Sequence, residues 1–371
     1  MEASLPRAAY CDADMFAVEQ RRALATSWVC VGRSDLVGPT PGSYRLVTVA
    51  GEHVLLVRDA TGLLGAFANR CAHRGTELVD STSQVHVSAC FDTVIRCPYH
   101  FWAYNLDGTL RAAPWIDDIN KAAFGLFQYD LDQWAGFIFV RVDGNAGVDS
   151  GTLMDELGPI ADRVGQYPLD ALVVGHSITY QVSANWKVIA ENYNECYHCG
   201  PVHPELCDLV PSFRIRGGGQ LAWDDGVPHR SGANTYTVTG TTTRLPFDGL
   251  DQAHLDNHFG ELIYPNLMLS LSRDHAAAFV LQPTAANQTT IVCDLLFHPT
   301  EVARPNFDPA DAVDFWHMVN LQDWAICERV QRGMTSASFV HGWYAPMEDP
   351  SLDIRRWWHA KMATGPATPS A

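Results

Sequence analysis

Two pairs of metal-binding residues in the first third of the chain, each a cysteine followed by a histidine, have spacings suited to an iron–sulfur cluster. Cys71 and His73 form a C-x-H pair, and Cys97 and His100 form a C-x-x-H pair. In a 2Fe–2S cluster of the Rieske type, two thiolates bind one iron and two imidazoles bind the other, so these side chains make a complete ligand set. The pattern therefore predicts an electron-carrying centre.

A structural zinc ion is the alternative, because two thiolates and two imidazoles also suit tetrahedral zinc. Zinc fingers, however, usually pair cysteine with cysteine and histidine with histidine, whereas both pairs in this chain are mixed. The pairs also stand next to turn residues and the short predicted strands Leu64–Asn69 and Thr93–Arg96. The mixed spacing favours the cluster over zinc.

A second group of potential metal ligands lies in the segment Glu191–His203. We expect a helix over Asn185–Tyr197, broken at Gly200-Pro201 so that the chain folds back and brings His203 beside His198. Two histidines and one carboxylate form a facial triad, which leaves positions on Fe(II) open for dioxygen. The segment therefore predicts a mononuclear iron site in addition to the cluster.

Three carboxylates are candidates for the third ligand of this site. Glu191 and Glu195 precede His198 by seven and three residues, so in a helix both lie near its face. Asp323, in a predicted C-terminal helix, is a distant alternative. A lone pair of histidines is more often an ordinary core or surface feature, but two histidines that flank a helix break beside acidic residues favour a metal.

The composition sets the broad class of the protein. With 371 residues the chain is long enough for two domains with separate cores. Its formal net charge of −17 argues against nucleic acid and anionic membranes as partners, because both attract basic patches. No apolar run approaches a membrane span, and Met1–Tyr10 lacks the layout of a signal peptide, so we expect a cytoplasmic protein.

The order of the predicted elements indicates an α+β fold. A helix is expected over Asp12–Trp28, and a long one over Asp308–Gln331, ending at Gly333. Between them we expect the strands Tyr44–Val49, His53–Asp59, Leu64–Asn69, Gly136–Val142, Leu172–Val182, Tyr236–Thr242, Leu267–Ser272, Ala277–Gln282 and Thr289–Phe297. The predicted organisation is a helical segment over 1–40 that packs with the C-terminal domain, a small all-β domain over 41–145 and a larger domain over 146–371.

Together, the two sets of motifs resemble the α-subunits of Rieske non-haem iron oxygenases. The supporting segments are Asn69–Gly75, Cys97–Trp102, Asn185–Lys187, Glu195–Pro204, Tyr264–Leu267 and Gln331–Gly333. The similarity runs from the N-terminal helix to the region around Glu348. Rieske proteins of respiratory complexes carry an extra cysteine in each loop, and Thr76 and Tyr99 stand in those places here.

The resemblance implies a 2Fe–2S domain joined to a helix-grip (START-like) catalytic domain with an antiparallel sheet and a long C-terminal helix. It implies that His198, His203 and Asp323 bind Fe(II), because relatives take the carboxylate ligand from the C-terminal helix. Glu195 then has another role, which is to link His100 of an adjacent subunit to His198 within a head-to-tail homotrimer.

Two features depart from the commonest family pattern. The loop between His73 and Cys97 is longer than in most relatives, and we expect the excess, Ser81–Cys90, to project as a hairpin that leaves the ligands undisturbed. Glu195 stands where many ring-hydroxylating relatives have aspartate. The Glu-Cys-Tyr-His pattern looks like the branch that oxidises quaternary ammonium compounds such as choline, betaines and carnitine.

The implied activity is oxidation of a small molecule with dioxygen and electrons from a separate flavin and iron–sulfur reductase, directly or through a ferredoxin. Oxidation of an N-methyl group of a quaternary ammonium or betaine-type substrate is one prediction. A cation prefers aromatic faces, and the catalytic region offers Tyr193, Trp223, Tyr236, Tyr264 and Trp324. The alternatives are hydroxylation or demethylation of an aromatic or other hydrophobic molecule, and an electron-transfer protein without oxygenase activity.

Overall fold

The computed structural model describes residues 1–84, 88–143 and 151–364, and the chain forms two compact units. One unit contains residues 1–19 and 157–371, and the other contains residues 20–156. The domain boundaries predicted after residues 40 and 145 stay predictions, and the second falls among residues 144–150, outside the described ranges. Within those ranges, no helix is long and apolar enough to cross a membrane.

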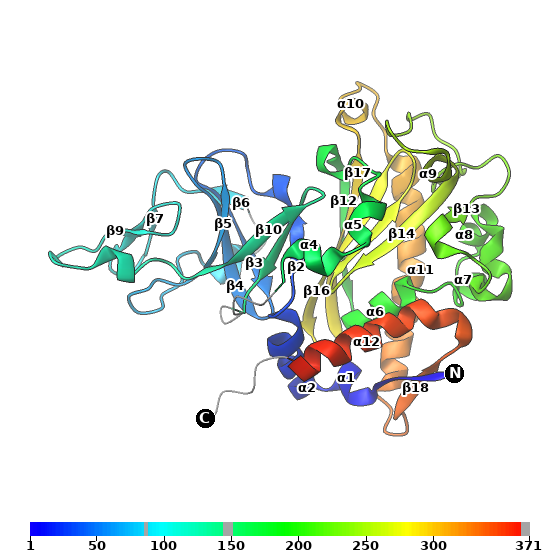
Figure 1. Ribbon diagram of the computed structural model, residues 1–371, viewed down its shortest axis with the longest axis horizontal. Helices are drawn as coiled ribbons and strands as arrows, with labels where there is room; N and C mark the ends of the chain where they lie inside the picture. The colour runs from blue at the N-terminus through cyan, green and yellow to red at the C-terminus, as the bar shows by residue number, and fades with distance from the viewer. Residues whose placement is uncertain (85–87, 144–150, 365–371) are drawn as a thin grey trace. The chain divides into compact units, whose positions relative to one another are not determined.

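The smaller unit is built from two antiparallel sheets (Figure 1). The larger sheet has the order β2-β11-β10-β5-β4-β3-β6, and the smaller has the order β7-β8-β9. Their strands are β2 (Val29–Arg33), β3 (Ser43–Val49), β4 (Glu52–Arg58), β5 (Leu64–Ala68), β6 (Ser88–Cys90), β7 (Ile95–Arg96), β8 (Ala103–Tyr104), β9 (Leu110–Ala112), β10 (Gln128–Trp134) and β11 (Phe137–Arg141). Buried side chains from both sheets, among them Leu55 and Tyr104, form one hydrophobic core with Cys71 and Cys97.

The prediction of a projecting hairpin at Ser81–Cys90 is wrong. A short helix, α3 (Ser81–Gln84), begins this segment, and residues 85–87 lie outside the described ranges. The segment then forms β6, which pairs antiparallel with β3 as an edge strand of the large sheet. An edge strand has unpaired backbone groups that can bond to an added strand, and this explains why the extra residues join the sheet.

The larger unit contains a six-stranded antiparallel sheet with the order β12-β17-β16-β15-β14-β13. Its strands are β12 (Val173–Val182), β13 (Val227–Pro228), β14 (Asn257–Ile263), β15 (Leu267–Leu271), β16 (Ala276–Ala285) and β17 (Gln288–Phe297). The main helices are α6 (Trp186–Tyr193), α11 (Ala310–Met334) and α12 (Asp349–Thr364), and both α11 and α12 pack on α6 (Figure 1). An antiparallel sheet with a long helix from the C-terminal part of the chain confirms the predicted α+β class.

Shorter elements complete this unit. They are α5 (Ile160–Val164), α7 (Cys199–Val202), α8 (Pro204–Leu209), α9 (Gln252–Asp256) and α10 (Pro299–Val302). The helix α4 (Leu153–Leu157) precedes them and lies, except for Leu157, in the smaller unit. The strand predicted over Tyr236–Thr242 does not form, and the segment consists of turns. Its threonine hydroxyls bond locally, as Thr237 Oγ1 does to the Thr241 carbonyl at 2.9 Å. Such bonds compete with a sheet ladder.

Residues 1–19 belong to the larger unit, and the helical turn that follows them belongs to the smaller one. The chain starts with β1 (Glu2–Pro6), which pairs with β18 (His341–Tyr344), and continues through α1 (Arg7–Cys11) and α2 (Ala13–Glu19) into a π-helical turn that ends at Leu24. The helix predicted over Asp12–Trp28 is therefore divided and shorter.

Buried contacts hold the end of α2 in the larger unit. The Glu19 carboxylate accepts hydrogen bonds from Lys187 Nζ at 2.6 Å, Trp186 Nε1 at 2.5 Å and Trp358 Nε1 at 2.9 Å. The side chains of Glu19 and Lys187 are fully buried. A buried charge needs such partners, because an unpaired one is costly.

Candidate functional site

The local fold between α6 and α8 sets the positions of the two histidines. Asn185 caps the start of α6, because its side chain accepts a hydrogen bond from the Lys187 amide at 3.0 Å, and the helix ends at Tyr193, earlier than predicted. Gly200-Pro201 does not break a helix but lies inside the single turn α7. Proline is tolerated there, because the first N–H groups of a helix have no intrahelical partner. The two histidines flank α7, with His198 before it and His203 after it.

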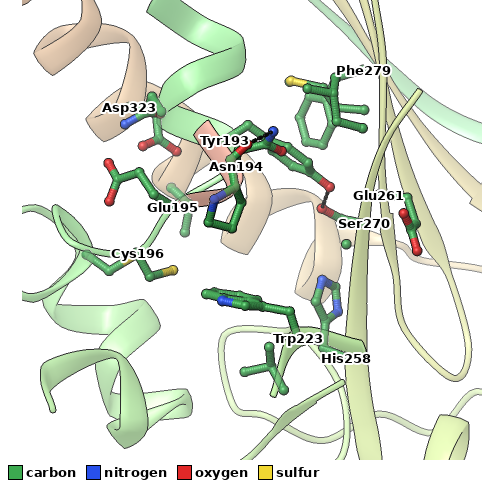
Figure 2. Close-up of a pocket in the computed structure, with 18 of the residues that line it drawn as sticks. Tyr193, Asn194, Glu195, Cys196, Trp223, His258, Glu261, Ser270, Phe279 and Asp323 are labelled. Carbon is green, nitrogen blue, oxygen red and sulfur yellow. Dashed lines mark hydrogen bonds between the residues drawn. The ribbon is translucent and has the colours of Figure 1, made fainter. Parts of the chain in front are cut away.

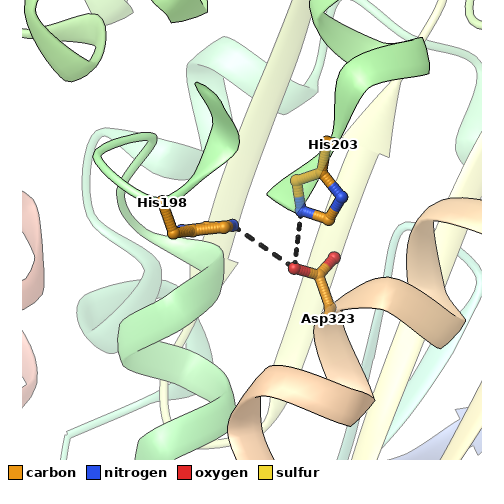
Figure 3. Close-up of side chains that lie close together, drawn as sticks. All are labelled: His198, His203 and Asp323. Atoms are coloured by element: carbon orange, nitrogen blue, oxygen red, sulfur yellow. Dashed lines mark hydrogen bonds and ion pairs between the residues drawn. The ribbon is translucent and has the colours of Figure 1, made fainter. Parts of the chain in front are cut away.

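His198 and His203 face one carboxylate, that of Asp323 on α11 (Figure 3). Asp323 Oδ1 lies 2.9 Å from His203 Nε2 and 3.3 Å from His198 Nε2. One ligand atom from each residue lies within 4.8 Å of the others. These are the donors of a facial triad with two histidines and one carboxylate, and the arrangement fits a divalent metal.

The other ring nitrogens of the histidines are fixed by acceptors outside the triad. His198 Nδ1 donates to Glu195 Oε1 at 2.6 Å, and His203 Nδ1 lies 2.8 Å from Gln322 Oε1. Gln322 Nε2 in turn donates to Glu205 at 2.9 Å. Metal-binding histidines usually donate their second N–H in this way, which orients the ring.

The two carboxylates that local spacing had offered as ligands lie elsewhere. Glu191 Oε1 accepts hydrogen bonds from the hydroxyls of Tyr10 and Tyr344, at 2.6 and 2.7 Å. Burial raises the pKa of Glu191 to about 7. Glu195 contacts the outer nitrogen of His198 and accepts from the backbone amides of Tyr197 and His198. Of the three candidates, Asp323 alone faces both Nε2 atoms.

The electrostatics of the triad favour a bound positive charge. Burial alone would lower the pKa of His198, but hydrogen bonds to Asp323, Cys199 and Glu195 outweigh it and raise the pKa to about 12. Burial alone would raise the pKa of Asp323, and its bonds to His198 and His203 instead hold it below the usual value. A metal cation satisfies the same demand for positive charge.

The four residues predicted to hold the cluster come from two loops of the smaller unit. In the first loop the Cys71 amide donates to the Thr76 carbonyl at 2.8 Å, and Gly75 has a φ of +76°, which glycine adopts without strain. In the second, the Cys97 amide donates to the Trp102 carbonyl at 2.8 Å. These turns bring the two loops together next to the sheet β7-β8-β9.

The two kinds of ligand differ in depth. Cys71 and Cys97 are buried, at 2 % and 1 % exposure, and their thiols interact. His73 is exposed, and its ring lies 4.9 Å from that of His100. Thiols inside and imidazoles outside suit a cluster whose outer iron has histidine ligands.

Tyr104 of β8 is a residue that the sequence analysis missed. Its hydroxyl lies 3.1 Å from Cys71 Sγ and accepts a hydrogen bond from the Ala72 amide at 3.0 Å. Hydrogen bonds to cluster sulfurs tune the reduction potential. The sequence offered no signal for this contact beyond an aromatic residue in a short strand.

A cavity of about 500 Å³ adjoins the triad and includes His198, His203 and Asp323 in its wall (Figure 2). All five aromatic residues put forward from the sequence also line it: Tyr193, Trp223, Tyr236, Tyr264 and Trp324. Further aromatic lining residues are Phe213, Phe279 and Trp316. The cavity thus combines many aromatic side chains with a metal-type donor set in its wall, as expected of a small-molecule site.

Polar residues that the sequence analysis did not identify also line the cavity. Arg163 of α5 forms a bidentate ion pair with Glu261 of β14, with distances of 2.5 and 2.8 Å. His258 stacks on Tyr236 at 3.6 Å between ring centres, and burial holds its pKa well below the usual value. These residues come from separate elements, so no local spacing in the sequence connects them.

Comparison with known proteins identifies the class. Residues 169–364 match the catalytic domain of the ring hydroxylating alpha subunits, and residues 27–123 match the Rieske [2Fe-2S] domain. The chain belongs to this family of Rieske oxygenases, whose cofactors are a Rieske 2Fe–2S cluster and a mononuclear iron. The predicted enzyme class and cofactors are confirmed.

Two named relatives cover most of the chain. The chain is 29 % identical over 345 residues to the carnitine monooxygenase oxygenase subunit of Acinetobacter baumannii, covering 91 % of this chain and 86 % of that one. It is 27 % identical to the glycine betaine monooxygenase oxygenase subunit of Chromohalobacter salexigens, covering 97 % and 86 %.

Solved structures share the fold. An inhibitor complex of the quaternary ammonium Rieske monooxygenase CntA aligns with a TM-score of 0.74 at 25 % identity, covering 97 % of this chain and 95 % of that one. Naphthalene 1,2-dioxygenase from Rhodococcus sp. aligns with a TM-score of 0.74 at 18 % identity, covering 98 % and 95 %, a likeness of fold alone.

Proposed function

We propose that this chain is the terminal oxygenase of a system that removes N-methyl groups from a quaternary ammonium or betaine-type substrate. The observation that carries the proposal is the aromatic cavity that adjoins the triad. Aromatic faces attract a desolvated ammonium group, and two relatives are named for carnitine and glycine betaine. Electrons come from a separate flavin and iron–sulfur reductase, directly or through a ferredoxin.

In this proposal the residues divide into two sets. Fe(II) is held by His198, His203 and Asp323, and the cluster by Cys71, His73, Cys97 and His100. When bound, the iron supplies the dioxygen chemistry and the cluster supplies electrons one at a time. The chain holds the donors in place, through Glu195 and Gln322 on the outer nitrogens of the histidines.

The overall reaction balances with one dioxygen and two electrons. One oxygen atom enters a C–H bond of an N-methyl group, and the other leaves as water after taking up two protons. The resulting N-hydroxymethyl ammonium loses formaldehyde and a proton, which leaves a tertiary amine. The cavity's role is to bind the ammonium on aromatic faces with one methyl group beside the triad.

Glu195 completes the proposed path for electrons. Its Oε1 atom accepts a hydrogen bond from His198 Nδ1, and its Oε2 atom accepts hydrogen bonds from backbone amides. In a homotrimer the same carboxylate would contact His100 of the partner subunit and so join the two centres across the interface.

Oxygen consumption by the reconstituted enzyme tests the proposal. With reductase and NADH, quaternary ammonium compounds are expected to drive oxygen uptake with equal amounts of formaldehyde. Neutral aromatic compounds of similar size are the control. Uptake driven by the aromatic compounds alone would contradict the proposed substrate class.

A further inference from the structure

We propose that the cavity selects a quaternary ammonium substrate that carries no carboxylate, such as a trimethylammonium alcohol, over a zwitterionic betaine. This inference rests on the proposed function and refines its substrate. It starts from the charges on the cavity wall, because a trimethylammonium head is common to both kinds of substrate and only the tail distinguishes them.

The wall has an excess of negative charge. Arg163 is the one cationic lysine or arginine side chain among the lining residues that the structure describes. Apart from Glu195 and the triad's Asp323, three carboxylates line the same cavity: Asp224, Glu261 and Asp353. Glu261 is paired with Arg163, and Asp353 is paired with Arg356 at 2.7 Å, so the excess negative charge rests on Asp224, Glu195 and Asp323. A cation entering this space gains favourable interactions with these carboxylates, whereas a substrate carboxylate is repelled by them.

The single guanidinium is already engaged. Arg163 Nε and Nη2 bond to the two oxygens of Glu261, at 2.5 and 2.8 Å. These bonds raise the pKa of Arg163 despite partial burial, and the charges of Glu261 and Asp224 raise it further. The side chain of Glu261 is only 13 % exposed. A substrate carboxylate that displaced Glu261 would therefore leave a largely buried carboxylate unpaired, which is strongly unfavourable.

The Arg163–Glu261 pair lies where it can contact the tail of a bound substrate. Figure 2 shows Glu261 and His258 across the cavity from Asp323. A methyl group beside the triad thus directs the rest of a small substrate towards Glu261 and His258. His258 Nδ1 lies 3.1 Å from Ser272 Oγ, and its low pKa keeps the ring neutral, so it offers an uncharged partner suited to a hydroxyl.

Choline and glycine betaine form a matched pair for the test, because they share the trimethylammonium head and differ in an alcohol or a carboxylate tail. Formaldehyde release by the reconstituted enzyme gives kcat/KM for each. We expect choline to be favoured by about tenfold or more, since leaving one charge unpaired costs more than the 1.4 kcal/mol of a tenfold ratio. Calorimetric titration of the oxidised holoenzyme, without reductase, is expected to give the same order of affinities.

Two variants test whether the Arg163–Glu261 pair causes the preference for choline. Glu261→Gln releases Arg163 and is expected to shift the ratio towards glycine betaine by about tenfold. The double variant R163Q/E261Q removes both charges and is the control, because it has no free guanidinium and is expected to keep the preference for choline. The absorption of the 2Fe–2S cluster and the melting temperature confirm that each variant is folded.

The outcomes separate the two proposals. If glycine betaine is demethylated in preference to choline by the unmodified enzyme, the inference is overturned and the proposed function stands. An unchanged ratio in Glu261→Gln overturns the role of the Arg163–Glu261 pair. If neither compound binds or yields formaldehyde while an aromatic compound drives oxygen uptake, the proposed function fails, and the inference fails with it.

Discussion

The two candidate metal sites are built in different ways. In the smaller unit, backbone turns place Cys71 and Cys97 in the core, and the imidazole of His73 is exposed. In the larger unit, His203 is buried, and side chains such as Gln322 orient the ligands from outside. The first site is specified by short segments and the second by tertiary packing. The difference suits an electron carrier that needs an exposed edge and an oxygenation site that needs an enclosed cavity.

Loss of a ligand is the strongest test of this comparison. Asp323→Ala removes the carboxylate that faces both Nε2 atoms and is expected to abolish both mononuclear iron and turnover. The 2Fe–2S spectrum should be unchanged, because its ligands lie in other elements. Metal analysis and electron paramagnetic resonance measure the two centres separately. A variant with full mononuclear iron would remove Asp323 from the ligand set.

The next largest effect is expected at Glu195, the proposed link between the cluster and the iron site. Glu195→Ala removes the acceptor at 2.6 Å from His198 Nδ1 and is expected to reduce turnover by about 100-fold or more, since such partners alone account for 10–100-fold. The cluster should still be reduced by the reductase at its normal rate, which stopped-flow absorption records. Glu195→Gln is the matched control for side-chain size. Normal turnover in Glu195→Ala would rule out the proposed bridge.

A smaller effect is expected on the pH dependence of the stability of the larger unit, through its buried carboxylate Glu191. The pKa of Glu191 is raised to about 7, so the folded protein binds a proton that the unfolded chain releases near pH 4.5. Stability is therefore lost as the pH rises from about 4.5 through 7, by about 2 kcal/mol between pH 5 and pH 8. Glu191→Gln should lack this loss.

Urea unfolding of the unmodified protein and of Glu191→Gln at pH 5 and pH 8 measures this effect. Glutamine keeps an acceptor for the hydroxyls of Tyr10 and Tyr344, which makes the comparison a matched one. Parallel changes in stability in the two proteins would show that Glu191 is not the titrating group.

The smallest effect is expected in the smaller unit, on the reduction potential of the cluster. Tyr104→Phe removes a hydroxyl 3.1 Å from Cys71 Sγ and is expected to lower the reduction potential of the cluster without releasing it. Redox titration followed by absorption records the shift, and turnover should fall only modestly. An unchanged potential would mean that the hydroxyl does not act on the cluster.

The sequence predicted those parts of each site that lie close together in the chain. The Cys–His pairs could be read directly, because their ligands occupy two short loops. Asp323 is 120 residues from His203, so it was only one of three candidates until the family resemblance favoured it. The Arg163–Glu261 pair spans 98 residues between a short helix and a strand, and no pattern connected the two.

The errors in secondary structure have local physical causes. The helix over Asn185–Tyr197 ends at Tyr193, and Gly200-Pro201 is accommodated in a helical turn rather than breaking one. The threonine-rich segment Tyr236–Thr242 has β propensity, but its hydroxyls bond to the nearby backbone. In the threonine-rich segment, short-range bonds thus outweighed the average preference of the residue types.

The Glu19 contacts have a consequence for synthesis on the ribosome. Residues 20–156 are continuous, so the smaller unit can complete its fold as soon as they emerge. Glu19 precedes them, yet its partners Lys187 and Trp358 follow much later in translation. Glu19 can therefore gain its first partner only after residue 187 has emerged, and it has its full set of partners only when Trp358 follows near the end of translation. We expect nascent chains stopped before residue 358 to expose α2 to proteases or chaperones.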